Sequence, residues 1–283
     1  MERTNKIYII GTLTDIKDLR EGEKDGKKWI AGTAVVSSND SEIELKYFSL
    51  DTTKDGSANK RYKNYIELAG KIGSRVKVNG ELSGRVFYNE STSQIINFNE
   101  VSAGFFNDAR PGDEDVATFE FGGFVVSPLH ERLDKEEKLV AYEFELGQAN
   151  FNGDGMQIVR FSVNKDDRKI VDSIQRFYTK GSTVFINGNI SYKVSLVEKT
   201  EEVAFGEPIV KSFQSTIKSF IVLGGKQPIM DTSAYSADQI SKLESAYKTY
   251  LADVEAEAKS RSEKGATAQS NGPSSNSKTD RLL

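Results

Sequence analysis

The sequence predicts an all-β protein in which two five-stranded barrels follow one another along the chain, with a helix and a disordered tail after them. Segments rich in β-branched and aromatic residues recur between turn clusters, which is typical of short strands. An ordered set of these segments occurs twice. The 283 residues are enough for two domains of ordinary size.

The repeat is clearest where a helix-like stretch leads into a strand. Residues 73–82 read GSRVKVNGEL and residues 181–190 read GSTVFINGNI, an offset of 108 residues. Helix-like segments at 62–72 and 168–180 precede them. Self-similarity on this scale indicates two copies of one domain. Three further pairs of segments match in the same order: 7–16 with 119–129, 43–53 with 158–167, and 93–104 with 212–224.

Each copy has the order strand, strand, strand, helix, strand, strand. This is the order of the OB-fold, a small barrel that binds oligonucleotides or oligosaccharides. We expect Gly73 and Gly181 to end the two helices in the left-handed conformation that glycine tolerates. The expected boundaries are a first OB-fold domain at 1–107, a linker at 108–116 and a second OB-fold domain at 117–228.

The C-terminal region predicts one helix and then disorder. The helical segment is 229–258, and within it Ser236 and Gln239 form a capping box at the start of the helix. A narrow apolar stripe suits docking on the second domain, and self-association or a partner helix are the alternatives. Residues 259–283 have almost no apolar side chains before the last two positions, which predicts a disordered tail.

Composition argues against catalysis. The chain has no cysteine and one histidine, His130, so disulfides, thiolate metal sites and cysteine nucleophiles are excluded. The sequence has no phosphate-binding loop and no nucleophile elbow. We expect no enzymatic activity, no catalytic residue, no cofactor and no metal.

Two further patterns concern the setting in which the protein works. No segment approaches the roughly 18 consecutive apolar residues of a membrane span. No signal peptide is visible at the start, MERTNK. We therefore expect a cytoplasmic protein without a membrane partner.

The net charge of −4 hides two basic segments. Residues 46–88 hold nine basic and four acidic residues, and residues 160–193 hold seven and three. Residues 113–145 instead hold three basic and ten acidic residues. A local basic face decides binding to a polyanion, so the first domain is the better candidate for a nucleic-acid site. Random scatter of charge is the alternative.

The sequence resembles the bacterial and phage replicative single-stranded DNA-binding proteins. Residues 5–13, NKIYIIGTL, are similar to the first strand of that family. Residues 178–188, YTKGSTVFING, are similar to its junction between the helix and the fourth strand. The resemblance implies an OB-fold that holds unpaired DNA during replication, recombination or repair. It also implies replication proteins as partners, bound through the C-terminal helix or tail.

Three features depart from that family. Two domains are joined in one chain here, whereas the familiar bacterial protein has one and assembles four. Trp29 is the sole candidate for the family's stacking tryptophans, and the end KTDRLL lacks an acidic tip. These departures favour a phage or mobile-element protein in the cytoplasm of a bacterial host, and they leave the oligomeric state open.

Binding of a single strand without sequence preference needs flat aromatic surfaces for bases and a basic track for phosphates. Phe48 aligns with Phe161 of the second copy and is expected in the core, so Tyr47 is expected at the surface. Trp29 is either a stacking platform or a core residue. The candidate nucleic-acid-binding residues of the first domain are Lys28, Trp29, Lys46, Tyr47, Lys60, Arg61, Arg75, Lys77, Arg85, Phe87 and Tyr88. Those of the second domain are Tyr142, Arg160, Tyr192 and Lys193.

Together these patterns predict a non-sequence-specific single-stranded DNA-binding protein. One alternative is an OB-fold adaptor that serves protein interaction or virion structure. The other is a single-stranded RNA binder.

Overall fold

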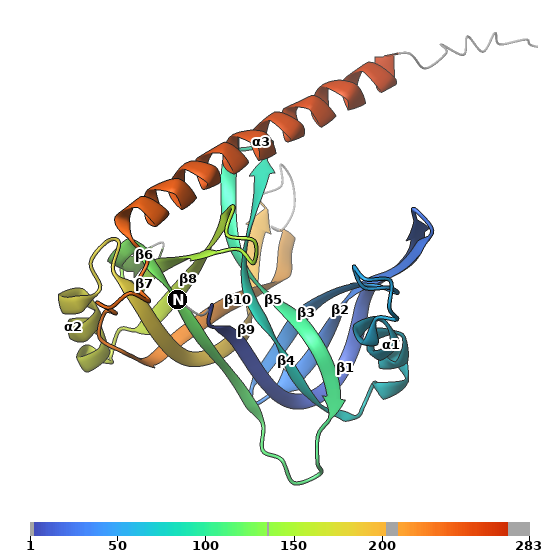
Figure 1. The fold of residues 1–283 in the computed structure, drawn as a ribbon, viewed down its shortest axis with the longest axis horizontal. Helices are drawn as coiled ribbons and strands as arrows, with labels where there is room; N and C mark the ends of the chain where they lie inside the picture. The colour runs from blue at the N-terminus through green and yellow to red at the C-terminus, as the bar shows by residue number, and fades with distance from the viewer. Residues whose placement is uncertain (1–2, 135, 202–208, 271–283) are drawn as a thin grey trace, which may run out of the picture.

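The computed structural model describes residues 3–134, 136–201 and 209–270. Over these residues the chain is mostly strand, with two short α-helices at its sides and a long helix across one end (Figure 1). No helix in this part of the chain combines the length and the apolar composition needed to cross a membrane.

The first half of the chain forms a closed ring of strands. Its pairs are β1–β2, β2–β3, β3–β5, β5–β4 and β4–β1, and β3–β5 is parallel while the others are antiparallel. A helix, α1, and a 3-10 turn, η1, separate β3 from β4. The elements are β1 (Asn5–Lys24), β2 (Lys27–Ser38), β3 (Ser41–Leu50), α1 (Lys60–Ile66), η1 (Glu67–Lys71), β4 (Arg75–Asn89) and β5 (Gln94–Asp108).

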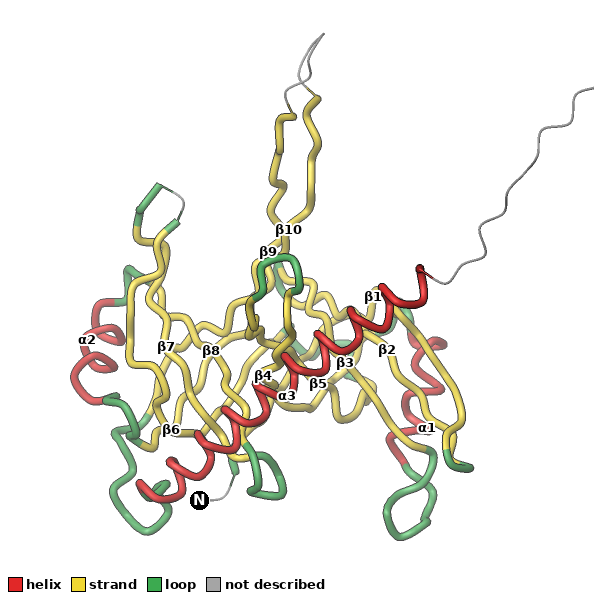
Figure 2. The backbone as a smooth tube through the Cα atoms, turned by 90° about the horizontal axis from the view of Figure 1, so that it is seen from above, coloured by secondary structure: helices red, strands yellow, loops and turns green. Residues whose placement is uncertain are grey.

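The second half repeats this pattern. Its ring is β6–β7, β7–β8, β8–β10, β10–β9 and β9–β6, again with one parallel pair, β8–β10. The elements are β6 (Val116–Leu133), β7 (Leu139–Ala149), β8 (Met156–Asn164), α2 (Arg168–Phe177), β9 (Thr183–Glu201) and β10 (Ile209–Gly225). Strand β1 also pairs with β6, so all ten strands belong to one hydrogen-bonded sheet. The hairpin of β9 and β10 projects from the body (Figure 2).

The interior of each half follows the strand alternation. In the second half, Phe161 is fully buried, and its ring centroid lies 5.2 Å from that of Phe121 and 5.9 Å from that of Phe144. Gly73 and Gly181 have φ angles of 86° and 84°, so both take the predicted left-handed conformation just before the fourth strand of their half. The helices themselves end earlier than predicted, α1 at Ile66 before the 3-10 turn η1 and α2 at Phe177, so neither glycine directly caps an α-helix.

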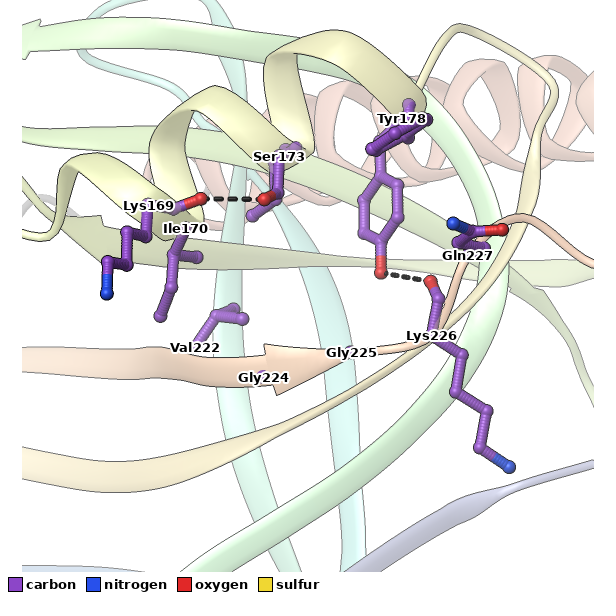
Figure 3. Close-up of a pocket in the computed structure, with 11 residues that line it drawn as sticks. Lys169, Ile170, Ser173, Tyr178, Val222, Gly224, Gly225, Lys226 and Gln227 are labelled. Atoms are coloured by element: carbon purple, nitrogen blue, oxygen red, sulfur yellow. Dashed lines mark hydrogen bonds between the residues drawn. The ribbon is translucent and has the colours of Figure 1, made fainter.

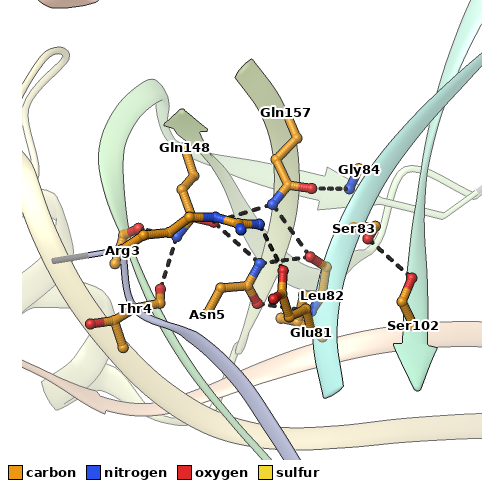
Figure 4. Close-up of polar contacts among 11 residues, drawn as sticks. Arg3, Thr4, Asn5, Glu81, Leu82, Ser83, Gly84, Ser102, Gln148 and Gln157 are labelled. Atoms are coloured by element: carbon orange, nitrogen blue, oxygen red, sulfur yellow. Dashed lines mark hydrogen bonds and ion pairs between the residues drawn. The ribbon is translucent and has the colours of Figure 1, made fainter. Parts of the chain in front are cut away.

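A buried polar network holds the two halves together (Figure 4). Gln148 of β7 is fully buried, and its amide donates to the backbone oxygens of Thr4 and Gly122 at 2.8 and 2.7 Å. Its carbonyl oxygen accepts from Asn5 at 3.2 Å and from Gln157 at 3.2 Å. Every polar atom of this side chain is therefore paired, which is what burial of an amide requires.

The C-terminal helix α3 (Ala237–Ser270) differs from the prediction in length and in position. Ser236 and Gln239 form the predicted capping box, with hydrogen bonds of 2.9 and 3.2 Å. The helix runs beyond residue 258, because ion pairs one turn apart, such as Lys259–Glu255 at 2.7 Å, support a polar helical surface. The predicted tail therefore begins as helix, and its residues 271–283 lie outside the described residues.

Helix α3 also docks on more than the second half. Tyr247 and Tyr250 line a cavity together with Arg85 of β4 and Gln157 of β8. The helix thus lies across both halves, as its place in Figure 1 shows. The predicted docking on the second domain is therefore part of a wider contact, because a local apolar stripe does not specify every surface that covers it.

Candidate nucleic-acid interface

An aromatic pair lies on the outward face of β2 and β3. Strand pairing puts Phe48 opposite Ala31, and Gly32 beside it faces inward against Tyr47. Phe48 is 60% exposed. The half-buried Trp29 stacks on it, with ring centroids 6.5 Å apart and ring planes 28° from parallel. The two rings form a flat apolar surface open to solvent.

The indole ring of the tryptophan packs against a glycine. Gly22 of β1 pairs with Trp29, and a Cβ atom at Gly22 would lie 2.7 Å from the indole ring. Such contacts do not occur between real side chains and rings, so the indole lies directly on the β1 backbone. The absence of a side chain at Gly22 fixes how Trp29 presents its ring.

Basic residues surround this aromatic pair. Lys46 lies two positions before Phe48 on the same face, and its ammonium group donates to Thr33 at 2.6 Å. Arg20 of β1 pairs with Ala31 and is exposed. Lys28 was also predicted here, but it precedes Trp29 by one residue in β2 and therefore points to the opposite face. The face therefore combines a stacking surface with cations. We name the group of Arg20, Trp29, Lys46 and Phe48 the aromatic–basic patch.

The negative charge closest to the patch is already neutralised. Glu44 lies two positions before Lys46 and forms ion pairs with Lys218 at 2.7 Å and with Lys17 at 3.4 Å. The hydrogen bond from Lys218 holds the pKa of Glu44 below its usual value, so the carboxylate stays charged and paired. It limits the patch on one side.

Tyr47 is not part of this surface, which corrects the prediction. It is 4% exposed, and its ring centroid lies 4.9 Å from that of Tyr65 and 6.2 Å from that of Phe106. Burial raises its pKa. The prediction aligned Phe48 with Phe161, but Phe161 faces inward and Phe48 faces outward, so that alignment was wrong by an odd number of residues. A shift of one residue along a strand exchanges the two faces.

Tyr192 is also buried, at 1% exposure, and lies where the two halves meet. Its backbone amide donates to the hydroxyl of Ser41 at 3.2 Å, and the ammonium group of Lys218 lies 5.2 Å from its ring centroid. Burial raises the pKa of its phenol. Tyr192 thus packs between the halves and offers no face to a base. Lys193 beside it is exposed and lines a groove of about 730 Å³ between the halves.

A second exposed aromatic pair lies on the β4–β5 hairpin. The rings of Phe87 and Phe98 meet edge to face at 5.8 Å, and the side chains are 45% and 43% exposed. Arg85, which pairs with Phe98 across the hairpin, forms an ion pair with Glu100 at 3.2 Å. Tyr88 points to the opposite face, where Lys259 of α3 lies 5.9 Å from its ring. The structure therefore brings Phe87 together with Phe98 and separates both from Tyr88.

The remaining basic candidates of the first half lie apart from the aromatic–basic patch. Arg75 is held by Asp115 at 2.7 Å. Lys77 lies 5.3 Å from the ring of Tyr8, on the side where β1 and β4 pair. Lys60 and Arg61 open α1, and the Arg61 guanidinium lies 5.6 Å from the ring of Phe105. These residues form no single track with Trp29.

The corresponding face of the second half is closed by ion pairs. Arg160 is 3.0 Å from Glu145 and 3.9 Å from Glu143, and Arg132 is 2.9 Å from Glu143. Tyr142 shares the inward face of β7 with Phe144 and packs against the core, so it is not a surface platform. The cations of this face are thus neutralised by their own neighbours.

Sequence reasoning missed Arg20, Phe48 and Phe98. Arg20 was missed because the first strand was expected to end at residue 16, whereas β1 continues to Lys24 past an irregularity between Lys17 and Arg20. Phe98 was missed because the hairpin register that sets it beside Phe87 is not visible locally. An exposed Phe two positions after an outward lysine was the available signal for Phe48.

Within the described ranges no three carboxylates or histidines gather in a way that could hold a metal ion. The chemistry of the face is that of stacking and charge attraction.

Comparisons with known proteins relate to the fold and the family. A family model described as YorF matches residues 3–257. A comparison with curated protein sequences gives no match. Among solved structures, the wild-type single-stranded DNA binding protein from Thermus aquaticus gives a TM-score of 0.50 at 12% identity, and the match covers 84% of this chain and 99% of that chain. A deletion variant of the same protein gives a TM-score of 0.49 at 13% identity, covering 84% and 100%. The wild-type match shows that the two chains share a fold.

Proposed function

The chain belongs to the YorF family, and we propose that it binds single-stranded DNA without sequence preference, as a protein without enzymatic activity. We further propose that its two halves are tandem OB-fold domains at 1–107 and 117–228, with a linker at 108–116. The two closed rings of strands, each with a helix before the fourth strand, support this division. The shared fold with a single-stranded DNA binding protein supports it independently.

The aromatic–basic patch carries the proposal. Any base presents a flat face that stacks on an aromatic ring, and each base brings one phosphate that a nearby cation attracts. Trp29 and Phe48 supply the rings, and Arg20 and Lys46 supply the cations. Stacking on a ring and attraction of a phosphate do not depend on the identity of the base, so we expect the binding to be sequence-tolerant.

The pair Phe87 and Phe98 extends this path along the outward face of the first half. Lys46 of β3 pairs with Ser102 of β5, and Phe98 lies four residues before Ser102 with its side chain on the same face. The two aromatic pairs thus lie towards opposite ends of one face. We propose that a single strand runs between them.

The cellular setting belongs to the same proposal. Protection of unpaired DNA serves replication, recombination or repair, in the cytoplasm of a bacterium that hosts a phage. Replication proteins are the proposed partners, bound through α3 or the residues after it. The exposed polar surface of α3 supports a role in contacts outside the two halves.

The test uses Trp29, which is the sole tryptophan of the chain. We expect saturating poly-dT to quench its fluorescence. Phe48→Ala should weaken binding by about 1–3 kcal/mol, the usual effect of losing one stacked base, while leaving thermal stability unchanged. Phe151→Ala is the matched control, because Phe151 is 87% exposed and lies on the loop between β7 and β8, away from the patch.

Three outcomes would contradict the proposal. Equal effects of Phe48→Ala and Phe151→Ala would remove the patch from the binding site. Binding of duplex DNA as tight as binding of poly-dT would exclude recognition by stacking. Equal competition by poly-U would assign the site to single strands of either nucleic acid.

A further inference from the structure

A groove on the second half lies far from the aromatic–basic patch in the fold. It runs between α2 and the end of β10, and its cavity measures about 380 Å³ (Figure 3). Ile170 and Ile174 of α2 and Val222 of β10 form an apolar lining. Phe177 at one rim is 37% exposed. Ile174 and Val222 are 4% and 3% exposed and form the floor of the groove, so its open apolar surface comes mainly from Ile170 and Phe177.

Specific contacts keep the groove open. Tyr178 follows α2, and its hydroxyl donates to the backbone oxygen of Lys226 at 2.8 Å, which fixes the end of β10 relative to the helix. Gly224 and Gly225 line the groove without side chains. A Cβ atom at Gly225 would lie 2.4 Å from the Tyr178 hydroxyl, so this close approach requires glycine. These contacts fix the position of β10 relative to α2 and so define the shape of the groove.

The charge around the groove has one sign. Lys169 of α2 and Lys226 after β10 both line it, and none of its lining residues carries a carboxylate. Figure 3 shows the Lys226 side chain directed away from α2, where its ammonium group lies 5.1 Å from the centroid of the Phe185 ring, so this side chain must turn to reach a ligand in the groove. In the part of the chain that the structure describes, neither lysine forms an ion pair at 4.0 Å or less. Asp172 of α2 lies outside the lining.

We propose that this groove binds a short acidic segment of a partner protein, whose apolar side chains enter between α2 and β10. Carboxylates of the segment would pair with Lys169 and Lys226, and the carboxamide of Gln227 is placed to bond its backbone. Charge complementarity selects an acidic occupant, and the aliphatic lining selects apolar anchors over nucleotide bases. The Arg176 guanidinium already covers one face of the Phe177 ring, at 5.1 Å from its centroid.

The experiment measures binding of a labelled peptide to the full chain by fluorescence anisotropy. The probe is a short peptide in which aspartate alternates with leucine and phenylalanine. We expect saturable binding that the double variant Lys169→Glu/Lys226→Glu weakens about tenfold or more. Ser173→Phe, a substitution on the exposed surface of α2 that fills the groove, should weaken it similarly. Single charge reversal at Lys248 of α3 is the control for net charge and should have little effect.

Four results would overturn the proposal. If Lys248→Glu weakens peptide binding as much as Lys226→Glu alone does, the loss of affinity comes from the change in net charge and not from the groove. A peptide with asparagine in place of aspartate binding equally well would remove the acidic specificity. Displacement of the peptide by poly-dT from a Phe48→Ala chain would make the groove a nucleic-acid site. Tighter peptide binding after deletion of residues 271–283 would make the chain's own end the occupant.

This inference is independent of the proposed function. Phe48→Ala is expected to weaken binding of poly-dT and to leave peptide binding unchanged. The double variant at Lys169 and Lys226 is expected to do the reverse. If one of the two binding experiments contradicts its proposal, the other proposal can therefore still be tested.

Discussion

Tyr47 and Phe48 are neighbours in the chain with opposite surroundings. Phe48 stacks with Trp29 in solvent, whereas Tyr47 packs against Tyr65 and Phe106 in the core. Successive side chains on a strand point to opposite faces, so one position decides between binding and packing. The hydroxyl of Tyr47 is buried and has no hydrogen-bond partner in the described part of the chain. Burial without a partner destabilises the fold.

This contrast predicts different outcomes for three substitutions. Tyr47→Phe removes the unpaired hydroxyl, so it should leave the free energy of unfolding unchanged or raise it by about 1 kcal/mol. Tyr47→Ala leaves a cavity and should cost about 3–5 kcal/mol. Phe48→Ala should change stability little. Urea denaturation of the three variants measures their relative stabilities. A clear loss of stability in Phe48→Ala would show that Phe48 contributes to the fold and not only to the surface.

The β1–β2 hairpin shows how an element places a functional group. β1 continues beyond the closed ring, passes the irregularity after Lys17, and pairs with the start of β2 at Gly22 and Trp29. The extended strand brings Arg20 to the outward face and provides the backbone on which the indole lies. The length of β1 therefore determines both a cation and the orientation of the tryptophan.

We expect a β-branched residue at Gly22 to disturb this arrangement without unfolding the protein. In Gly22→Val the new Cβ would require a space that the Trp29 ring occupies, and valine favours strands. Binding of poly-dT should weaken by about 1–3 kcal/mol, the effect of a lost base stack, and Trp29 emission should shift to longer wavelength. Gly26→Val is unsuited as a control because its φ is 73°, so Glu23→Val, whose side chain points to the opposite face of β1, serves instead. Unchanged Trp29 emission in the Gly22→Val variant would contradict the packing of the indole ring on the β1 backbone.

Sequence alone was sufficient for the order of elements and insufficient for register. The order of strands and helices repeats through local periodicity and through Gly73 and Gly181, which a single sequence displays. The orientation of Tyr47, the burial of Tyr192 and the pairing of Phe87 with Phe98 depend on long-range pairing. A strand pattern determines which residues share a face, and only packing determines which face is inside. The candidate site was therefore half predicted: the sequence suggested Trp29 and Lys46, it put Lys28 on the wrong face, and it did not suggest Arg20 or Phe48.

At the scale of the whole molecule, the two halves meet through equivalent positions with unequal residues. Gly84 of β4 and Tyr192 of β9 are 108 residues apart, the offset of the repeat. Gly84 donates its backbone amide to Gln157 at 3.2 Å, and Tyr192 donates its own to Ser41 at 3.2 Å. A Cβ atom at Gly84 would lie 1.8 Å from the backbone oxygen of Ile158, whereas Tyr192 fills its place with a buried ring. The contact thus has the pattern of a two-fold interface made within one chain.

Pairing of β1 with β6 and the network around Gln148 make this contact a part of the fold. Gln148 belongs to the second half, and its partners include Thr4 and Asn5 of the first. Replacing it by an apolar residue leaves buried donors and acceptors without partners on both sides, and such orphaned groups cost about 1–3 kcal/mol each. The two halves are therefore expected to unfold together.

Gln148→Leu tests this coupling, because Trp29 reports on the first half alone. The variant should lower the denaturation midpoint seen by Trp29 fluorescence and the midpoint seen by far-ultraviolet circular dichroism by the same amount, with a loss of about 2–3 kcal/mol. Gln175→Leu on the exposed surface of α2 is the matched control and should change neither. A midpoint that falls by circular dichroism but stays constant by Trp29 fluorescence would mean that the halves unfold separately. The polar network would then position the halves without stabilising the first, and the single-strand path on the first half would be independent of its neighbour.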